Sequence, residues 1–207
     1  MIEKQTRMPP LDVVSWRPLS SGPTMSNDAI LFYSTLVALL ALLALAIAVG
    51  LVIYRLVKGP DASLLLGNKA IWLAWLVALV ATIGSLIYSE VIHFEPCRYC
   101  WFQRIAMYPL AIILVVGAIR REFQVKYYAL PLSLIGLGIS IYHYLLQTFP
   151  SIEEGGACGI VSCSAKYVDI FGFISIPFMA GSGFIVISVL LGLYVNKNSI
   201  QETARVE

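Results

Sequence analysis

The chain has 207 residues, of which 59% are hydrophobic and 13% are charged, and its formal net charge is +2. Soluble globular proteins average about 45–50% apolar and about 25% charged residues, so this composition excludes an ordinary soluble domain and indicates an integral membrane protein. The small net charge, with basic residues scattered between apolar segments, argues against a protein that binds nucleic acid or an acidic substrate.

Five apolar segments are each long enough to cross the hydrocarbon core of a bilayer, roughly 30 Å, which takes about 17–25 helical residues. Because backbone polar groups must be satisfied inside lipid and none of these runs alternates as strands do, helices are expected. The predicted fold class is all-α, a four-helix transmembrane bundle plus one additional N-terminal transmembrane helix. The segments are predicted at 30–54, 71–92, 101–119, 127–146 and 173–194.

The first apolar run is the one segment that could be read as a signal peptide. It exceeds the apolar core of such a peptide, about 7–15 residues, and it ends in a basic flank at Arg55 and Lys58. A transmembrane helix is therefore preferred, whether translation starts at Met1 or at Met25. The predicted organisation is an N-terminal tail over 1–28, the extra helix over 29–56, a four-helix domain over 57–196 and a tail over 197–207.

Lysine and arginine lie in alternate connecting segments and so predict the orientation in the membrane. They occur in the loops 55–70 and 120–126 and in the C-terminal tail, which the positive-inside rule places on the cytoplasmic side. Alternation then places 93–100 and 147–172, and with them every cysteine, on one extracytoplasmic face.

The four cysteines form two closely spaced pairs, Cys97 with Cys100 and Cys158 with Cys163. Disulfides persist in an oxidising compartment, so two structural bridges are one interpretation. Loops this short restrain little of the entropy of the unfolded chain, which favours exchangeable, redox-active bonds. No metal is expected, because the chain has only two histidines and no HExxH, and the cysteines lack the repeated C-x-x-C spacing of structural zinc.

The first pair has a context that favours a reactive thiol. Pro96 predicts that Cys97 opens the third helix, with Cys100 one turn further on the same face. Free amides and the helix dipole would stabilise a thiolate there, and Arg104 adds a cation four residues after Cys100. From its position alone Arg104 equally suits an interfacial anchor; its spacing from Cys100 favours a role beside the thiol. Trp101 is expected in an aromatic interfacial belt, together with Phe102.

The second pair lies among three glycines and the acids Glu153 and Glu154, which predict a flexible loop able to carry electrons between partners. His143, near the outer end of the fourth helix, is either a packing residue or a proton donor to a bound acceptor. For Glu90 and His93, interfacial solvation is favoured over proton transfer. No nucleotide-binding loop occurs, so an electron acceptor should be lipid-soluble.

The segment 97–110, CRYCWFQRIAMYPL, resembles the signature of the DsbB/BdbC family of disulfide bond formation proteins. The resemblance continues in YHYLLQ at 142–147, in the 157–163 loop and in GFISIPF at 172–178, and it spans roughly residues 71–194. It implies a quinone-dependent thiol oxidase that reoxidises a DsbA-like thioredoxin-fold protein on the outer face of the cell membrane. The redox-active segments of this chain would be 93–104 and 147–172.

The resemblance also implies roles for individual residues. Cys97 and Cys100 would be the quinone-linked pair, with Cys100 the thiolate in contact with the quinone and Arg104 beside the ring. His143 would lie close to the quinone. The second pair would accept electrons from the reduced partner, the mixed disulfide forming at the first of its two cysteines, Cys158, with Cys163 completing the pair.

Two departures and two alternatives accompany the resemblance. The cysteines of the second pair are closely spaced, as in the short-loop Gram-positive members of the family, which favours menaquinone over ubiquinone as the electron acceptor. The extra N-terminal helix has no assigned role beyond that of a membrane anchor. One alternative is a vitamin K epoxide reductase-like protein, in which the loop cysteines precede the C-x-x-C rather than follow it. The other is a membrane scaffold stapled by two disulfides, with no catalytic role.

Overall fold

The computed structural model describes residues 26–59, 66–67, 69–149 and 162–195. These residues form helices and connecting turns, with no strand among them beyond an isolated bridge between Ile170 and Ile174. Five helices are long and apolar enough to cross a membrane, which confirms the predicted fold class. They are α1 (Asn27–Lys58), α2 (Lys69–Leu86) with the π-helical turn η2 (Ile87–Val91), α3 (Arg98–Arg120), α4 (Val125–Thr148), and α5 (Ile176–Val189) with the π-helical turn η4 (Leu190–Tyr194).

Helix ends differ from the predicted ones where capping, rather than hydropathy, sets the boundary. α1 begins three residues early because the Ser26 hydroxyl accepts a hydrogen bond from the backbone N–H of Ala29, at 3.3 Å. α5 begins three residues late. Phe171 and Gly172 have positive φ values of 56° and 77° there, and Pro177 lies in the first turn, a position proline favours.

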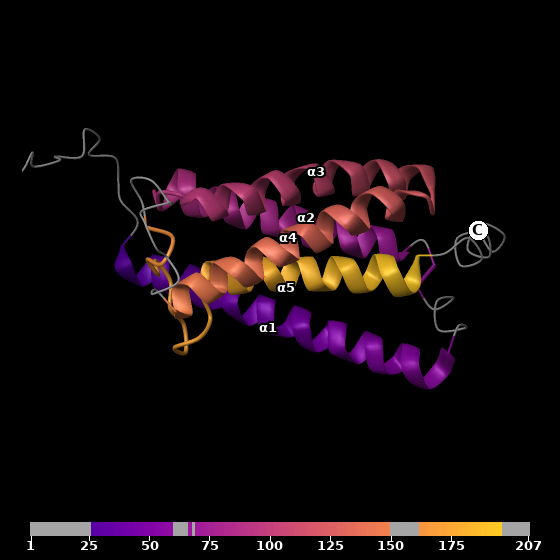
Figure 1. The fold of residues 1–207 in the computed structure, drawn as a ribbon, viewed down its shortest axis with the longest axis horizontal. Helices are drawn as coiled ribbons and strands as arrows, with labels where there is room; N and C mark the ends of the chain where they lie inside the picture. Colours follow the sequence, from indigo (N-terminus) through magenta and orange to yellow (C-terminus); the bar gives the residue numbers. More distant parts are fainter. Residues whose placement is uncertain (1–25, 60–65, 68, 150–161, 196–207) are drawn as a thin grey trace, which may run out of the picture.

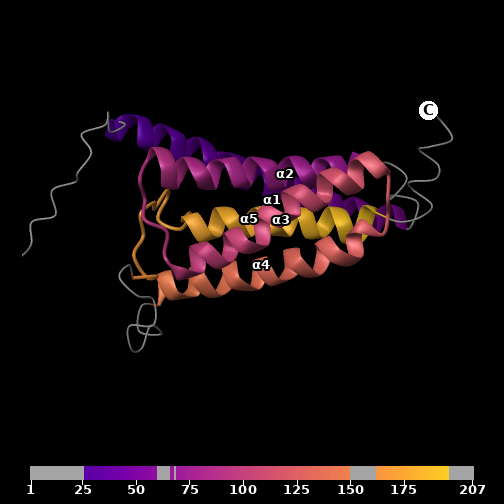
Figure 2. The same cartoon turned by 90° about the horizontal axis from the view of Figure 1, so that it is seen from above.

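Helices α2 to α5 form a closed four-helix bundle, and α1 lies outside it (Figures 1 and 2). Each of the four packs on the next along the chain, and α5 returns to α2. The centre is filled by fully buried side chains such as Leu110, Leu114 and Ile187. Gly136 of α4 lets the ring of Phe184 approach so closely that a Cβ at this position would overlap it, as expected for small-residue packing.

The extra helix α1 is packed against the bundle rather than detached from it. Its main contact is with α5, and large side chains such as Leu39 and Leu43 point outward. Its buried residues are small, which lets helix backbones approach closely in a membrane: Ser34, Ala38, Ala41 and Ala48. Tyrosine hydroxyls also link α1 to α2, η2 and η4: Tyr33 donates to the Gly84 carbonyl (3.1 Å), Tyr88 to Ser34 Oγ (3.2 Å) and Tyr194 to the Leu51 carbonyl (2.6 Å).

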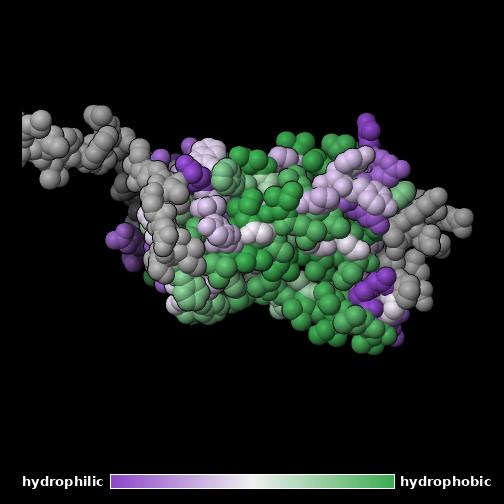
Figure 3. Space-filling model, viewed as in Figure 1, coloured by the Kyte–Doolittle hydropathy of each residue, from purple (hydrophilic) through white to green (hydrophobic). Residues whose placement is uncertain are grey.

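The two ends of the bundle differ in charge. A hydrophobic band covers the middle of the face in Figure 3, and hydrophilic side chains lie toward both ends. The starts of α1, α3 and α5 lie at one end (Figure 1), which therefore holds the first cysteine pair. In the described ranges the opposite end holds one acid, Glu122, and a set of basic residues: Arg55, Lys58, Lys69, Arg120, Arg121 and Lys126.

Candidate active site

The first cysteine pair lies at the start of α3, as predicted. Cys97 is the N-cap residue, in an extended conformation, and its carbonyl accepts a hydrogen bond from the N–H of Trp101 at 3.1 Å. Both cysteines are free thiols. Their sulfurs are hydrogen-bonded at 3.4 Å, with Cys97 5% exposed. The structure therefore places a nearly buried dithiol at the helix terminus.

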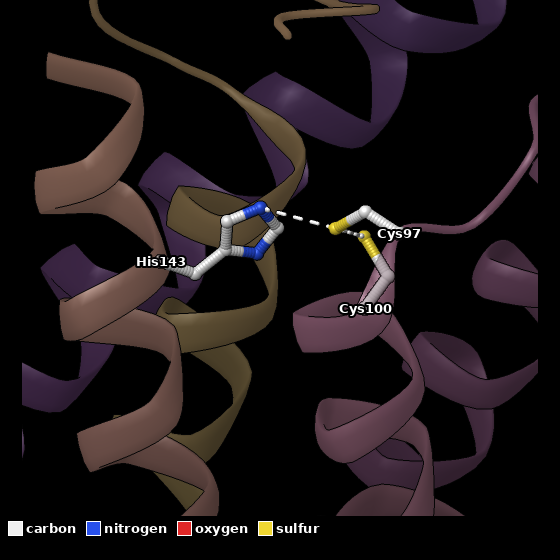
Figure 4. A group of neighbouring side chains, drawn as sticks. All are labelled: Cys97, Cys100 and His143. Atoms are coloured by element: carbon white, nitrogen blue, oxygen red, sulfur yellow. Dashed lines mark hydrogen bonds between the residues drawn. The ribbon is translucent and has the colours of Figure 1, made fainter. Parts of the chain in front are cut away.

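His143 of α4 is brought to this dithiol from 46 residues away in sequence (Figure 4). Its side chain is 1% exposed, and Nε2 lies 3.5 Å from Cys97 Sγ. On the other side of the ring, Gln103 Nε2 lies 3.4 Å from Nδ1. With the amide donating to Nδ1, the ring proton resides on Nε2 and is directed at Cys97. His143 is thus a hydrogen-bond donor to the thiol.

Gln103 is the site residue that sequence reasoning missed. It is 5% exposed and lies one turn after Cys100 on α3. Its amide has no charge and does not titrate, so it was not predicted to be a site residue. The available signal was an amide facing a bundle interior, where a buried polar group requires a partner.

These contacts lower the pKa of the Cys97 thiol to about 4. The hydrogen bond with Cys100 contributes most, burial acts in the opposite direction, and the hydrogen bond and electrostatic interaction with His143 lower the pKa further. At neutral pH Cys97 is therefore a thiolate. This differs from the expectation that Cys100 carries the thiolate, because the histidine reaches the sulfur of Cys97. Contact between Cys100 and a quinone stays a prediction.

Cys163, from the second pair, lies beside the first. It is disulfide-bonded, is 0% exposed and packs with Cys97 and Leu146 in one cluster, against which Tyr99 and Cys100 also pack. Cys158, and the part of the predicted flexible loop between 150 and 161, lie outside the described residues. The structure thus brings a free dithiol and a disulfide-bonded cysteine into one buried cluster.

Stacked aromatic rings tie the loop that carries Cys163 to the segment before Cys97. The ring of Phe94 stacks on Tyr167 with centroids 4.9 Å apart, and on Tyr88 at 5.9 Å. Such pairs contribute about 0.5–1.5 kcal/mol each beyond the area they bury. The stack therefore helps to hold the two redox segments together.

Arg104 lies one turn after Cys100 and is turned into the bundle. It is 9% exposed, Nε donates to Ser85 Oγ at 2.9 Å, and Nη2 donates to the Ser85 carbonyl at 3.1 Å. The guanidinium also lies 5.4 Å from the ring centroid of Trp101. Within the described ranges no carboxylate pairs with it. An anchor that snorkels to the headgroups would instead be exposed.

Two further polar groups lie one turn from the Arg104–Ser85 contact, away from the cysteines. Thr82 precedes Ser85 by three residues on α2, and Tyr108 follows Arg104 by four on α3. Both hydroxyls are buried without a hydrogen-bond partner among the described residues. A buried polar group without a partner costs about 1–3 kcal/mol. A cation and two free hydroxyls at the α2–α3 contact therefore suit a ligand with polar oxygens.

The remaining candidates lie at the surface. Glu90 is exposed and accepts a hydrogen bond from Ser89 Oγ at 3.0 Å, and His93 is exposed in a backbone conformation with φ of 62°. Trp101 is 52% exposed and Phe102 43%, as expected for an aromatic belt. None of these side chains has a described hydrogen bond to the dithiol.

Residues 68–194, more than half of the chain, match the family described as "Disulfide bond formation protein DsbB". The similar proteins include "Disulfide bond formation protein C" of Bacillus subtilis, 44% identical over 135 residues, 64% of this chain and 98% of the relative. Others are "Probable disulfide formation protein C" of Halalkalibacterium halodurans, 46% identical over 117 residues (56% and 85%), and "Probable disulfide formation protein" of Oceanobacillus iheyensis, 52% identical over 120 (57% and 83%). No solved structure matches significantly.

The family match covers α2 to η4 and leaves out α1. It favours disulfide formation over the vitamin K epoxide reductase-like alternative. With five helices suited to a membrane and a free dithiol at one end of the bundle, the role supported is that of a membrane disulfide oxidoreductase. The chain belongs to the DsbB family of disulfide bond formation proteins.

Proposed function

We propose that the chain is a quinone-dependent thiol oxidase that reoxidises a DsbA-like thioredoxin-fold protein on the outer face of the cell membrane. One observation carries the proposal. The disulfide-bonded Cys163 packs against the free dithiol of Cys97 and Cys100. An electron relay requires a free dithiol and a disulfide-bonded cysteine in one place, and both lie in this buried cluster.

The charge distribution supports the orientation. The end of the bundle opposite the cysteines carries six lysines and arginines against one acid within the described ranges, and positively charged loops stay in the cytoplasm. The cysteines then face the outside, where disulfides persist, and the C-terminus lies in the cytoplasm. A DsbA-like protein would be accessible only from that outer face.

In the first step, a thiolate of the reduced partner attacks a disulfide between Cys158 and Cys163, which we infer to be partners because Cys97 and Cys100 are free thiols. The mixed disulfide forms at Cys158 and Cys163 leaves. The second thiol of the partner then displaces Cys158. The partner departs oxidised, and two electrons and two protons remain on Cys158 and Cys163.

In the second step, the reduced Cys163 attacks the sulfur of Cys97 in an inner disulfide, because these two residues lie in one buried cluster, and Cys100 leaves. Cys158 then attacks Cys163 and releases Cys97. The low pKa of Cys97 makes it a good leaving group. The products are an inner dithiol and an outer disulfide, the arrangement that the described thiols have.

A lipid-soluble acceptor fits the α2–α3 contact, where the buried hydroxyls of Thr82 and Tyr108 have no partner among the described residues. The residues that would hold it are Arg104, with Thr82 and Tyr108 one turn away, and Cys100 and His143 from the dithiol side. A bound quinone, menaquinone by the resemblance, would supply a two-electron, two-proton acceptor for the dithiol. Arg104 would stabilise negative charge on an oxygen of that ligand, a role that a positioned cation performs well in an apolar site.

The test mixes the purified chain, a reduced thioredoxin-fold protein and a soluble quinone, and follows quinone absorbance and loss of partner thiols. We expect both signals to change together. Absence of thiol-dependent quinone reduction by the folded wild-type chain would refute the oxidase and favour the non-catalytic scaffold.

Two variants test the assigned residues. Arg104→Ala should reduce quinone turnover by about 100-fold or more, whereas Arg120→Ala, exposed at the far end of the same helix, should leave it unchanged. Equal effects of the two would return Arg104 to the anchor interpretation. Cys163→Ser should trap the partner through Cys158, and a trap through Cys97 would overturn the proposed order.

A further inference from the structure

We propose that the reduced Cys97–Cys100 pair and His143 together form a binding site for one Zn²⁺ ion. The three side chains come from two helices and meet at one point (Figure 4). Their ligand atoms all lie within 4.8 Å of one another, and within the described ranges this is the one group of three histidine, cysteine or acidic residues so arranged. The sequence predicted no metal because the chain has only two histidines and no HExxH, and because its cysteines lack the repeated C-x-x-C spacing of structural zinc.

The distances suit a tetrahedral ion. With Zn–S of about 2.3 Å and Zn–N of about 2.0–2.1 Å, two ligand atoms of a tetrahedral site lie about 3.5–3.8 Å apart. The sulfurs of Cys97 and Cys100 are 3.4 Å apart, and Cys97 Sγ lies 3.5 Å from His143 Nε2. The widest pair is within 4.8 Å, so a rotation of the half-buried Cys100 side chain, which closes about 1 Å, completes the set.

The surroundings also suit a metal ligand. A histidine that binds zinc through one nitrogen usually donates the other N–H to an acceptor, which fixes the ring. Gln103 lies against His143 Nδ1 at 3.4 Å, and turning its amide presents the oxygen to an Nδ1–H. Two thiolates neutralise the charge of the ion, so the complex adds no net charge to the apolar cluster.

The ligand types select the metal. Sulfur and imidazole nitrogen favour zinc over calcium or magnesium, which prefer oxygen, and zinc has no redox chemistry with thiols. Because Cys97 is already a thiolate, binding at neutral pH releases the remaining thiol proton, that of Cys100, to solvent and transfers no electrons. An inner disulfide has no thiolate to offer, so only the reduced pair binds.

Zinc binding would hold the dithiol out of oxidation, because both sulfurs are then metal ligands. The consequence for turnover rests on the proposed function, whereas the binding itself does not. A direct measurement of binding therefore separates a failure of this site from a failure of the quinone proposal.

The experiment uses the full chain carrying Cys158→Ser and Cys163→Ser, so that the inner pair is the only dithiol. Calorimetry with Zn²⁺, and the thiolate-to-metal absorption band of Co²⁺ displaced by Zn²⁺, should give one ion per reduced chain. Oxidation of the inner pair should abolish binding. No binding by the reduced chain, or equal binding after oxidation, would overturn the site.

The histidine gives the sharper comparison. His143→Ala should weaken zinc binding at least 100-fold, since even second-shell changes cost about 10–100-fold. His93→Ala removes the other histidine of the chain, which is exposed, and should leave the affinity unchanged. Equal affinity of the His143→Ala chain and the wild type would reduce the site to simple dithiol chelation and refute the proposal. His143→Gln provides the same comparison if the alanine variant does not fold.

Discussion

Removal of His143 should raise the pH at which the first thiolate of the inner pair forms. The contacts of Cys97 lower its pKa to about 4, whereas an ordinary cysteine titrates near 8.5. The thiolate is present above the pKa and is lost as the pH falls through it. At pH 6 the described contacts therefore keep about 99% of the thiol ionised, compared with about 0.3% for an ordinary cysteine.

The magnitude follows from the hydrogen bond between His143 Nε2 and Cys97 Sγ, 3.5 Å long. A hydrogen bond to a charged group contributes about 1.5–3 kcal/mol, and 1.36 kcal/mol corresponds to one pH unit. His143→Ala should thus raise the pKa of Cys97 by about 1–2, to about 5–6. At pH 5 the thiolate fraction falls from about nine-tenths to between about one-half and one-tenth.

The assay is ultraviolet thiolate absorbance against pH for the purified protein with its inner pair reduced and its outer disulfide intact. Absorbance suits this thiol better than alkylation, because Cys97 is only 5% exposed. Because the two thiols titrate as a coupled pair, the curve alone does not assign the first ionisation to one of them. Cys100→Ser removes the second thiol but keeps a hydroxyl donor, so an ionisation step that persists in this variant belongs to Cys97. Gln103→Leu should shift the step in the same direction by less, because the histidine loses its orientation but not its place.

His93→Ala is the matched control for this titration, since His93 is exposed and has no described contact with the pair. The reasoning fails if the wild-type step lies near that of an ordinary thiol. It also fails if His143→Ala and His93→Ala give the same curve as the wild type, because the hydrogen bond would then contribute nothing.

Two predictions concern the packing of the bundle. Gly136→Ala places a Cβ against the Phe184 ring and should lower the free energy of unfolding by about 1–3 kcal/mol. The control Gly138→Ala, with open space at its Cβ, should be neutral or slightly stabilising. Thermal unfolding in detergent compares the two variants, and equal midpoints would contradict the overlap with the Phe184 ring. Tyr194→Phe removes the 2.6 Å hydrogen bond to α1 and should lower the free energy of unfolding by about 1 kcal/mol. The control Tyr128→Phe, at a side chain 68% exposed, should have no measurable effect. The same unfolding assay compares them, and equal stability of the two variants would show that this hydrogen bond does not hold α1 to the bundle.

Hydropathy predicted all five helices because a membrane demands the same property along the whole length of each span. The ends were less predictable, since they depend on single residues such as the Ser26 cap and the turn at Phe171 and Gly172. The docking of α1 was not predicted at all. Its buried stripe of small residues is part of a run of alanine and leucine, and hydropathy does not distinguish a packed face from a lipid-facing one.

The site was predictable where its chemistry is local in sequence. Pro96 and the C-x-x-C spacing placed Cys97 at a helix start, and the position of Arg104 one turn after Cys100 followed from helical periodicity. The partners came from other helices and left no trace in local spacing. Ser85 binds Arg104 from α2, and His143 approaches Cys97 from α4. The assignment of the thiolate depended on this last contact and therefore required the fold.

The distribution of buried polar side chains explains why one part of this protein was easier to predict than the other. Burial of a polar side chain in an apolar bundle costs free energy unless it is paired, and here His143, Gln103 and Arg104 gather at the cysteine end of α3 and α4. Further along α3 the buried side chains are apolar, as at Leu110 and Leu114. Hydrophobic packing therefore supports the bundle along most of its length. Among the described residues the buried arginine, histidine and glutamines all lie at the cysteine end, whereas the buried polar residues elsewhere in the bundle are serines, such as Ser133 and Ser182, that donate to backbone carbonyls. At the cysteine end a change of one side chain should therefore alter the chemistry more than the stability.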